Sequence, residues 1–152
     1  RICPSSPEMR GAWVGASWSH SQAHFARSIL ESVAYEYAYY LKILLELLPD
    51  LKLVEARVVG GGARSGVWNQ IKADVLNVPY QRLKGNEFGA WGAAMIAGKA
   101  GGLINDLAAH AEQAAFLDGK PSFPSKENHE LYKPLIEKYI LLEGMLNQFF
   151  AI

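Results

Sequence analysis

The chain of 152 residues contains one cysteine, Cys3, so no disulfide can form within it. This usage is typical of a reducing compartment. No apolar run reaches the ~18 residues that a membrane-spanning helix needs. The 15 basic and 15 acidic residues cancel to a formal net charge of zero, so no general attraction to nucleic acid or anionic membranes is expected. These absences predict a cytoplasmic protein that binds neither nucleic acid nor membrane.

Familiar catalytic and metal-binding patterns are also absent. Neither the zinc-protease pattern HExxH nor the hydrolase pattern GxSxG occurs. His20 and His24 lie four residues apart and could share a helix face, but a zinc site would need further ligands. Acidic residues occur singly, and Asp74 lies in an expected helix, where its side chain is predicted to bond a neighbouring loop. We therefore expect no catalytic residue and no metal ligand in this chain.

What the chain does contain is a glycine-rich turn between a β-branched run and an amphipathic segment. The run Glu55 to Val59 predicts a strand, three glycines follow, and Val67 to Leu76 has helical periodicity with Ser65 as its N-cap. A turn at the carboxyl end of a strand that opens a helix is a common nucleotide site. The alternative is that the turn is only tight and packed against its neighbours.

Two known phosphate motifs do not fit this turn. A Walker A loop needs Lys and then Ser or Thr after its last glycine, whereas Gly66 is followed by Val67 and Trp68. The dinucleotide fingerprint needs a third glycine where Ser65 stands. Backbone contact with a flat, neutral group such as a base fits the turn better than a pyrophosphate cradle does.

The whole pattern predicts one α/β layered domain with a parallel or mixed sheet, because strands and helices alternate along the chain. Two helices carry apolar stripes that we expect to be buried. The stripe of the long helix is Phe25, Ile29, Val33, Tyr37, Leu41, Leu44 and Leu48, and that of the last helix is Leu131, Leu135, Tyr139, Leu142 and Leu146. The expected strands are 11–18, 55–59 and 80–83, and the expected helices are 21–48, 65–76, 87–100, 105–116 and 125–150.

Four stretches in order resemble the carboxy-terminal domain of the FGGY carbohydrate kinases. They read SSPEMRGAWVGASWSHSQAHFARSILESVAYEY, VVGGGARSGVWNQIKADVLNVPY, EFGAWGAAMIAG and PSFPSKENHELYKPLIEKY. Xylulokinase-like members look nearest, and alditol kinases are second. The resemblance implies an actin-like ATPase, ribonuclease-H-like fold with a mixed sheet flanked by helices. It also implies transfer of the γ-phosphate of ATP to a sugar or polyol hydroxyl, with magnesium.

The resemblance implies that ATP lies with its adenine and ribose against the glycine turn. Some relatives have an Asn that touches the base where this chain has Ser65 and Gly66. The helix that begins near Glu87, with Gly89 and Gly92, closes the same side. The expected cofactor-binding residues are Gly60, Gly61, Gly62, Ala63, Ser65 and Gly66.

Other parts of the family's pattern have no match. The amino-terminal Gly-x-Asp-x-Gly-Thr phosphate loop, the sugar-binding residues and the catalytic aspartate are missing, and the match begins after the first strands of the carboxy-terminal domain. We therefore expect residues 1–152 to be an incomplete carboxy-terminal domain, inactive alone, whose partner is an amino-terminal domain that holds most of the magnesium site. An open sheet edge beside residues 11–18 is expected to recruit a strand or to cause homo-oligomers to form. The alternative is a stand-alone actin-like module that binds a nucleotide or a protein without catalysis.

Overall fold

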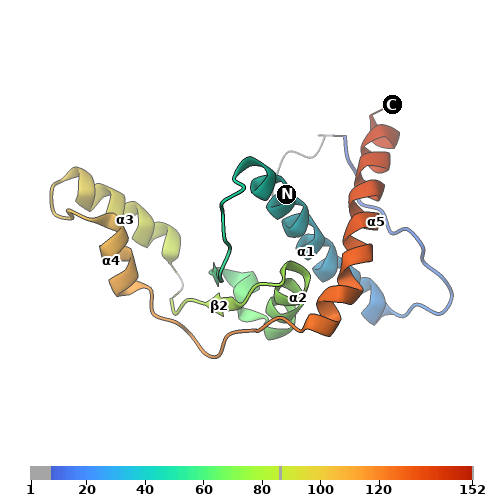
Figure 1. The fold of residues 1–152 in the computed structure, drawn as a ribbon, viewed down its shortest axis with the longest axis horizontal. Coiled ribbons are helices and arrows are strands. Elements are labelled where there is room, and N and C mark those ends of the chain that lie inside the picture. The colour runs from blue at the N-terminus through green and yellow to red at the C-terminus, as the bar shows by residue number, and fades with distance from the viewer. Residues whose placement is uncertain (1–7, 86, 152) are drawn as a thin grey trace.

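A long helix, α1 (Gln22–Leu47), crosses the middle of the protein and contributes to its core. The computed structural model describes residues 8–85 and 87–151. Ser21 is the N-cap of α1, as the sequence predicts, and its backbone N–H donates to His24 Nδ1 at 3.1 Å. Helices α2 (Gly66–Leu76) and α5 (Lys126–Phe150) pack against α1 and against each other. Figure 1 shows α1 and α5 side by side with α2 at their base.

The sheet of the described residues has two parallel strands, β1 (Ala56–Val58) and β2 (Tyr80–Arg82), connected through α2. Ala56 lies opposite Tyr80 and Val58 opposite Arg82. On its other side β2 makes two antiparallel bridges, Tyr80 with Ser122 and Leu83 with the residue at 117, so the pairing is mixed. The strands expected at 55–59 and 80–83 are confirmed, each somewhat shorter than expected.

The core lies between the three helices and follows the predicted stripes only in part, since Tyr139 of the α5 stripe packs against it. Its buried members are Ala34, Tyr35, Ile71, Val75 and Tyr132. Ile29, Leu44 and Leu48 of the expected α1 stripe are exposed, and so are Leu131 and Leu135 of the expected α5 stripe. The cause is that α1 meets two helices at one point, where the small side chain of Ala34 allows a close approach.

Aromatic rings form the contact between α5 and α1, and of these rings Tyr139 belongs to the expected α5 stripe while Tyr132 does not. The Tyr35 ring lies 5.9 Å from the ring of Tyr132 and 5.6 Å from that of Tyr139. The Tyr132 hydroxyl donates to Glu31 at 2.9 Å, and the Tyr139 hydroxyl donates to Glu36 at 3.0 Å. Tyrosines therefore bury their rings and keep a hydrogen-bond partner for each hydroxyl, which leucines at the expected positions could not do.

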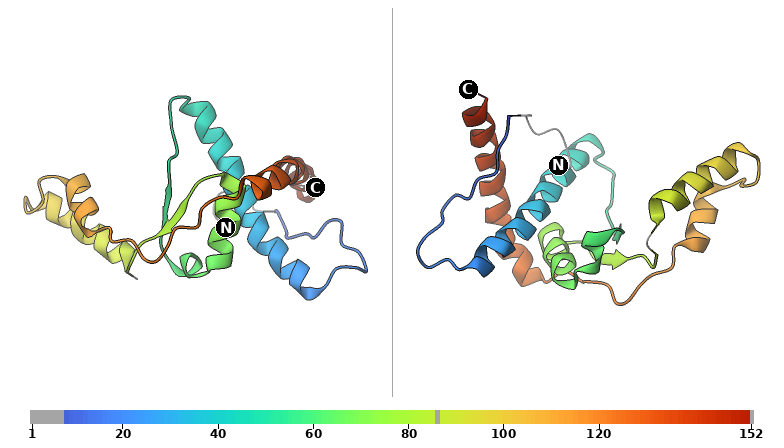
Figure 2. Two further views of the ribbon diagram at one scale, coloured as in Figure 1. Left: turned by 60° about the horizontal axis from the view of Figure 1, so that its bottom comes forward. Right: turned by 180° about the vertical axis from the view of Figure 1, so that it is seen from behind.

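Helices α3 (Phe88–Ala100) and α4 (Leu107–Ala114) form a separate arm. Both figures show this pair projecting away from the other helices (Figure 1, Figure 2). Asp106, not the expected Asn105, caps α4 by accepting the backbone N–H groups of residues 108 and 109 at 2.9 and 3.1 Å. In the part of the chain that the structure describes, Met95 is the one buried residue of α3.

Residues 11–18 form an exposed loop, so the strand expected there is wrong. Gly15 has a φ of 84°, which breaks an extended conformation. Trp13 instead packs its ring 6.0 Å from that of Phe25 and donates from Nε1 to Ser28 at 3.2 Å. Alternating bulk cannot make a strand without a neighbour to pair with. No helix among the described residues is both long and apolar enough to span a membrane.

Candidate functional site

The glycine turn joins β1 to α2, and this prediction is confirmed. Gly60 has a φ of 85°, a conformation that residues with a Cβ rarely adopt. A short 3₁₀ helix, η1 (Gly61–Arg64), follows it. Ser65 is the N-cap of α2, and its hydroxyl accepts the backbone N–H of Trp68 at 3.2 Å. The chain thus reverses direction within a few residues and presents the turn at the carboxyl end of β1.

Hydrogen bonds from within the protein hold the turn in place. The Ala63 N–H donates to the Gly60 carbonyl at 3.2 Å, and the Asn69 side chain donates to the Ala63 carbonyl at 2.8 Å. Trp68 donates from Nε1 to the carbonyl of Leu30 on α1 at 3.0 Å. Ala63 and Asn69 are buried. The turn is therefore a preformed surface attached to both helices.

The glycines of the turn serve different purposes. A Cβ on Gly62 would lie 2.8 Å from Cζ3 of Trp68, so glycine is needed there for packing. A Cβ on Gly60, Gly61 or Gly66 would meet nothing within 4 Å. Tight packing therefore explains one glycine, while the other three border open space that another molecule could occupy.

The electrostatics of the turn favour an electron-rich ligand. The first backbone N–H groups of α2, beginning at Gly66, have no acceptor within the helix and form its positive end. The first turn of α2 contains no acidic residue. Ser65 and Gly66 are exposed at this end. The site can thus donate hydrogen bonds from backbone to a ring nitrogen, a hydroxyl or an anionic oxygen.

A groove of about 580 Å³ runs along β1 beside the turn. Lys72 of α2 lies in it, 6% exposed, with Nζ 4.8 Å from the centre of the Trp68 ring and 5.2 Å from that of Tyr80. Burial lowers the pKa of Lys72. Lys72 is not among the site residues that the sequence predicts, although its place four residues after Trp68 puts both on one helix face. The lining residues are Tyr37, Ala56, Arg57, Val58, Val59, Gly62, Ala63, Trp68, Lys72 and Tyr80.

Asp74 bonds a neighbouring loop, as the sequence predicts. Its carboxylate accepts the backbone N–H of Ser125 at 2.8 Å and the side-chain amides of Gln70 and Asn128 at 2.8 and 2.9 Å. Asp74 is buried. These bonds connect α2 to the start of α5, so Asp74 has a structural role.

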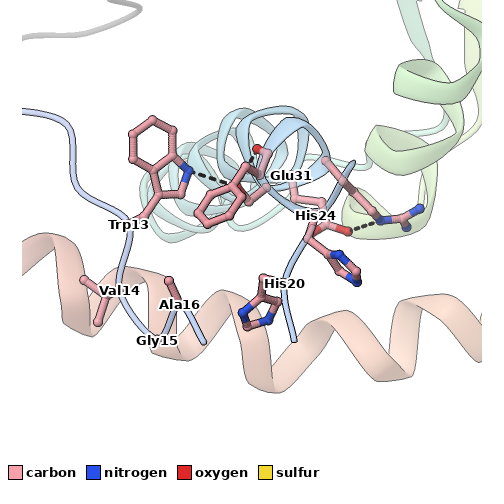
Figure 3. A pocket seen from close by; sticks show the side chains of 10 residues that line it. Trp13, Val14, Gly15, Ala16, His20, His24 and Glu31 are labelled. Atoms are coloured by element: carbon pink, nitrogen blue, oxygen red, sulfur yellow. Dashed lines mark hydrogen bonds and ion pairs between the residues drawn. The ribbon is translucent and has the colours of Figure 1, made fainter. Parts of the chain in front are cut away.

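A second hollow, of about 260 Å³, lies between the exposed loop and the start of α1, and Figure 3 shows its lining side chains. His20 and His24 lie together on one side of it, with ring centres 5.4 Å apart. Their Nδ1 atoms accept the backbone N–H groups of Ser17 at 2.8 Å and Ser21 at 3.1 Å. Among the described residues, no three His, Cys, Asp or Glu side chains gather as metal ligands. The two histidines thus shape the start of the helix.

Solved structures with this arrangement are sugar kinases. A xylulose kinase from Lactobacillus acidophilus matches 95% of this chain with a TM-score of 0.78 and 26% identity, and the match covers 29% of that protein. A xylulose kinase from Rhodospirillum rubrum matches 91% of the chain with a TM-score of 0.72 and 31% identity, covering 28% of that protein. The fold is therefore the actin-like fold of these kinases, represented here by a helix-rich part with a small sheet.

The sequence gives the family. Residues 1–101 match the FGGY family of carbohydrate kinases, C-terminal domain. The chain therefore belongs to this family, and the resemblance noted in the sequence is confirmed. It is 33% identical over 133 residues to a xylulose kinase from Staphylococcus epidermidis and 35% identical over 128 residues to a glycerol kinase from Bacillus subtilis. These matches span 87% and 83% of the chain, but only 26% and 25% of the relatives' own lengths.

Proposed function

We propose that this chain is the nucleotide-side part of the carboxy-terminal domain of a longer, cytoplasmic kinase. That kinase transfers the γ-phosphate of ATP to a hydroxyl of a sugar, such as the ketopentose xylulose, or of a polyol. The observation that carries the proposal is the preformed turn between β1 and α2, with open space at Gly60, Gly61 and Gly66, in a member of a carbohydrate kinase family.

In this proposal the adenine and ribose of ATP lie against the turn. The exposed glycines let the flat base approach the backbone closely. The Ser65 hydroxyl and the backbone N–H of Gly66, at the positive end of α2, supply the donors, since the backbone N–H of Ser65 already donates to Gly62. Gly62 and Ala63 contribute indirectly, because the packing of Gly62 on Trp68 and the hydrogen bond to the Ala63 carbonyl set the shape of the turn. The donors and the free space at the turn fit this half of the nucleotide.

Magnesium and the reacting groups belong to the rest of the kinase in this proposal. Phosphoryl transfer needs charge stabilisation at the γ-phosphate and a group that takes the acceptor's proton. Magnesium supplies part of that charge stabilisation when it is bound. The contribution of this chain is to bind and orient the far end of ATP, which positions the phosphates for reaction.

The test is the substitution Gly61→Ala in the full-length protein, with Gly144→Ala as a control. Neither Cβ would meet a protein atom within 4 Å, so both variants should fold. The methyl group at position 61 would occupy the space of the base, so we expect the KM for ATP to rise about tenfold, a cost of about 1.4 kcal/mol. The control on α5 should leave it unchanged. Equal KM values for both variants would contradict the proposed site.

Activity assays test the function itself. Full-length protein should consume ATP in the presence of a ketopentose or a polyol, and residues 1–152 alone should consume none. If the full-length protein binds ATP but phosphorylates no sugar or polyol, the chain belongs to a nucleotide-binding module without catalysis. Turnover by residues 1–152 would show that catalytic groups lie within them.

A further inference from the structure

Trp68 is the side chain against which the glycine turn packs. Its six-membered ring lies so close to Gly62 that a Cβ there would come within 2.8 Å of Cζ3. Its Nε1 donates to the carbonyl of Leu30 on α1 at 3.0 Å, and its backbone N–H donates to the hydroxyl of Ser65 at 3.2 Å. One indole thus contacts the turn, the N-cap of α2 and α1, so the position of the ring and the shape of the turn depend on each other.

Gly62 connects this ring to the nucleotide surface. It lies in η1 between Gly60 and Gly61 on one side and Ser65 on the other. Its carbonyl accepts the backbone N–H of Ser65 at 3.3 Å. A movement of the Trp68 ring that shifted Gly62 would therefore displace both parts of the proposed contact with adenine and ribose.

Lys72 lies over the face of the same ring. Its side chain is 6% exposed, and its Nζ lies 4.8 Å from the centre of the Trp68 ring and 5.2 Å from that of Tyr80. An ammonium group over an aromatic face is attracted by the electrons of the ring, and the attraction is stronger when the pair is desolvated. Within the part of the chain that the structure describes, Lys72 makes no hydrogen bond or ion pair. Its charge there contacts the two rings.

The other charged and titratable groups of the groove do not share this contact with Trp68. Arg57 of β1 lines the groove, but it pairs with Glu55 at 2.6 Å and is half-exposed. Tyr37 of α1 and Tyr80 of β2 are the titratable groups that line it. Burial, followed by Tyr37, raises the pKa of Tyr80 to about 12, while burial lowers the pKa of Lys72. Lys72 therefore gives up its proton at a lower pH than Tyr80 does.

We propose that Lys72 is a positioning residue for ATP: its charge fixes the Trp68 ring, and the ring fixes the turn that receives the base. The inference rests on the proposed function, which assigns ATP to this turn. Lys72 acts through Trp68 and does not touch the nucleotide. Its replacement should therefore weaken the binding of ATP more than it lowers kcat.

The test measures the dissociation constant of ATP by calorimetry in the full-length protein. Lys72→Met removes the charge and keeps the length of the side chain, and we expect binding to weaken about fivefold. Lys72→Arg keeps a cation that can stack on the ring, so its binding should stay within about twofold of the parent protein. Lys138→Met, at an exposed position of α5, is the matched control and should leave binding unchanged. Equal dissociation constants for Lys72→Met and Lys138→Met would overturn the proposal.

Thermal melting separates positioning from general stability. Replacing a buried charge by an apolar side chain of similar size is often neutral or stabilising. Without ATP, Lys72→Met should therefore melt no lower than the parent protein, although it binds ATP more weakly. A lower melting temperature would mean that Lys72 supports the fold as a whole, and the positioning role would be wrong.

The pH profile of ATP binding gives a readout that packing alone would not change. Because burial lowers the pKa of Lys72, its ammonium group loses its proton at a lower pH than an ordinary lysine does. ATP binding by the parent protein should weaken as the pH rises through this change. Lys72→Arg keeps its charge and should lack this part of the fall. Identical profiles for the two proteins would contradict the role of the charge.

Gly61→Ala distinguishes a failure of this inference from a failure of the proposed function. If Gly61→Ala weakens ATP binding and Lys72→Met does not, the nucleotide site stands and the role of Lys72 is wrong. If neither variant weakens binding, the site itself is wrong. A protein whose ATP binding depends on Lys72 as expected, but which phosphorylates no sugar or polyol, contradicts the function and leaves the positioning role standing.

Discussion

The three-helix lobe of α1, α2 and α5 and the arm of α3 and α4 contain similar side chains but use them differently. In the lobe, Ile71 and Val75 are almost fully buried. In the arm, Ile96 and Leu103 are exposed, although α3 is the most apolar helix of the protein. The difference teaches that apolar composition predicts a helix but not its burial, because burial needs a partner surface at the right place.

The two regions also differ in how their polar groups are used. Lobe carboxylates such as Asp74 and Glu31 accept hydrogen bonds from a neighbouring helix or its cap. In the arm, the Asp106 carboxylate accepts backbone N–H groups from the first turn of its own helix. The lobe is therefore stabilised by tertiary contacts, and the arm mainly by local ones. Matched substitutions in the two regions should test this contrast.

The largest effect is expected for isoleucine. Ile71→Ala should lower the free energy of unfolding by about 3 kcal/mol, because it leaves a cavity in the core. Ile71 is 4% exposed, whereas Ile96 is 67% exposed. Ile96→Ala should change the free energy of unfolding by less than ~0.5 kcal/mol. Urea denaturation of both variants measures the difference. A comparable loss for Ile96 would show that the arm is packed as firmly as the lobe.

Aspartate provides the second pair. Asp74→Ala should cost about 2 kcal/mol, since partly buried donors on α2 and at the start of α5 lose their buried acceptor. Asp106→Ala removes only a helix cap, worth about 1 kcal/mol to α4. Denaturation should detect the first change globally, and hydrogen exchange should detect the second as faster opening of α4 alone. If Asp106→Ala lowered the stability of the lobe equally, the two regions would unfold as one unit.

Glycine gives effects of opposite sign. Gly62→Ala should destabilise the protein by about 1–2 kcal/mol, because the new methyl group would meet the Trp68 ring. Gly92 lies inside α3, and a Cβ there meets nothing within 4 Å. Gly92→Ala should therefore stabilise α3 by up to ~1 kcal/mol through helix propensity. Thermal melts of the 152-residue chain measure both. A loss from Gly92→Ala would mean that something packs closely on α3.

The smallest effect concerns the pH dependence of stability. Burial, and then the neighbouring Glu36, raise the pKa of Glu143 in the lobe. The folded state thus keeps a proton on Glu143 at pH values where the unfolded state releases it. The contribution of Glu143 to the free energy of unfolding is therefore fully present at low pH. It is lost as pH rises above the ordinary value of 4.5 and through the raised pKa. Glu143→Gln should flatten that fall. A pH profile of stability that is the same for Glu143→Gln as for the unchanged protein would contradict the assignment.

Local signals in the sequence determined the helices of the lobe and the glycine turn. Ser21, Ser65 and Ser125 cap the three lobe helices as expected. Each cap acts within a few residues: the hydroxyls of Ser65 and Ser125 accept backbone N–H groups of their helices, and the Ser21 N–H donates to His24. Gly60 marks the end of β1 because few other residues adopt its φ of 85°. The family could be recognised for the same reason, since its motifs are runs of neighbouring residues.

Tertiary structure decided which faces these elements bury and what their polar groups contact. Tyr35 and Tyr132 form the contact between α1 and α5 in place of the expected leucine stripes, because a ring and a hydroxyl satisfy both surfaces at once. Trp68 explains Gly62, and the groove explains the position of Lys72, only once α2 lies against η1 and β2. Residues 11–18 have strand-like composition and form a loop, since a strand depends on hydrogen bonds to a partner that a local pattern cannot supply.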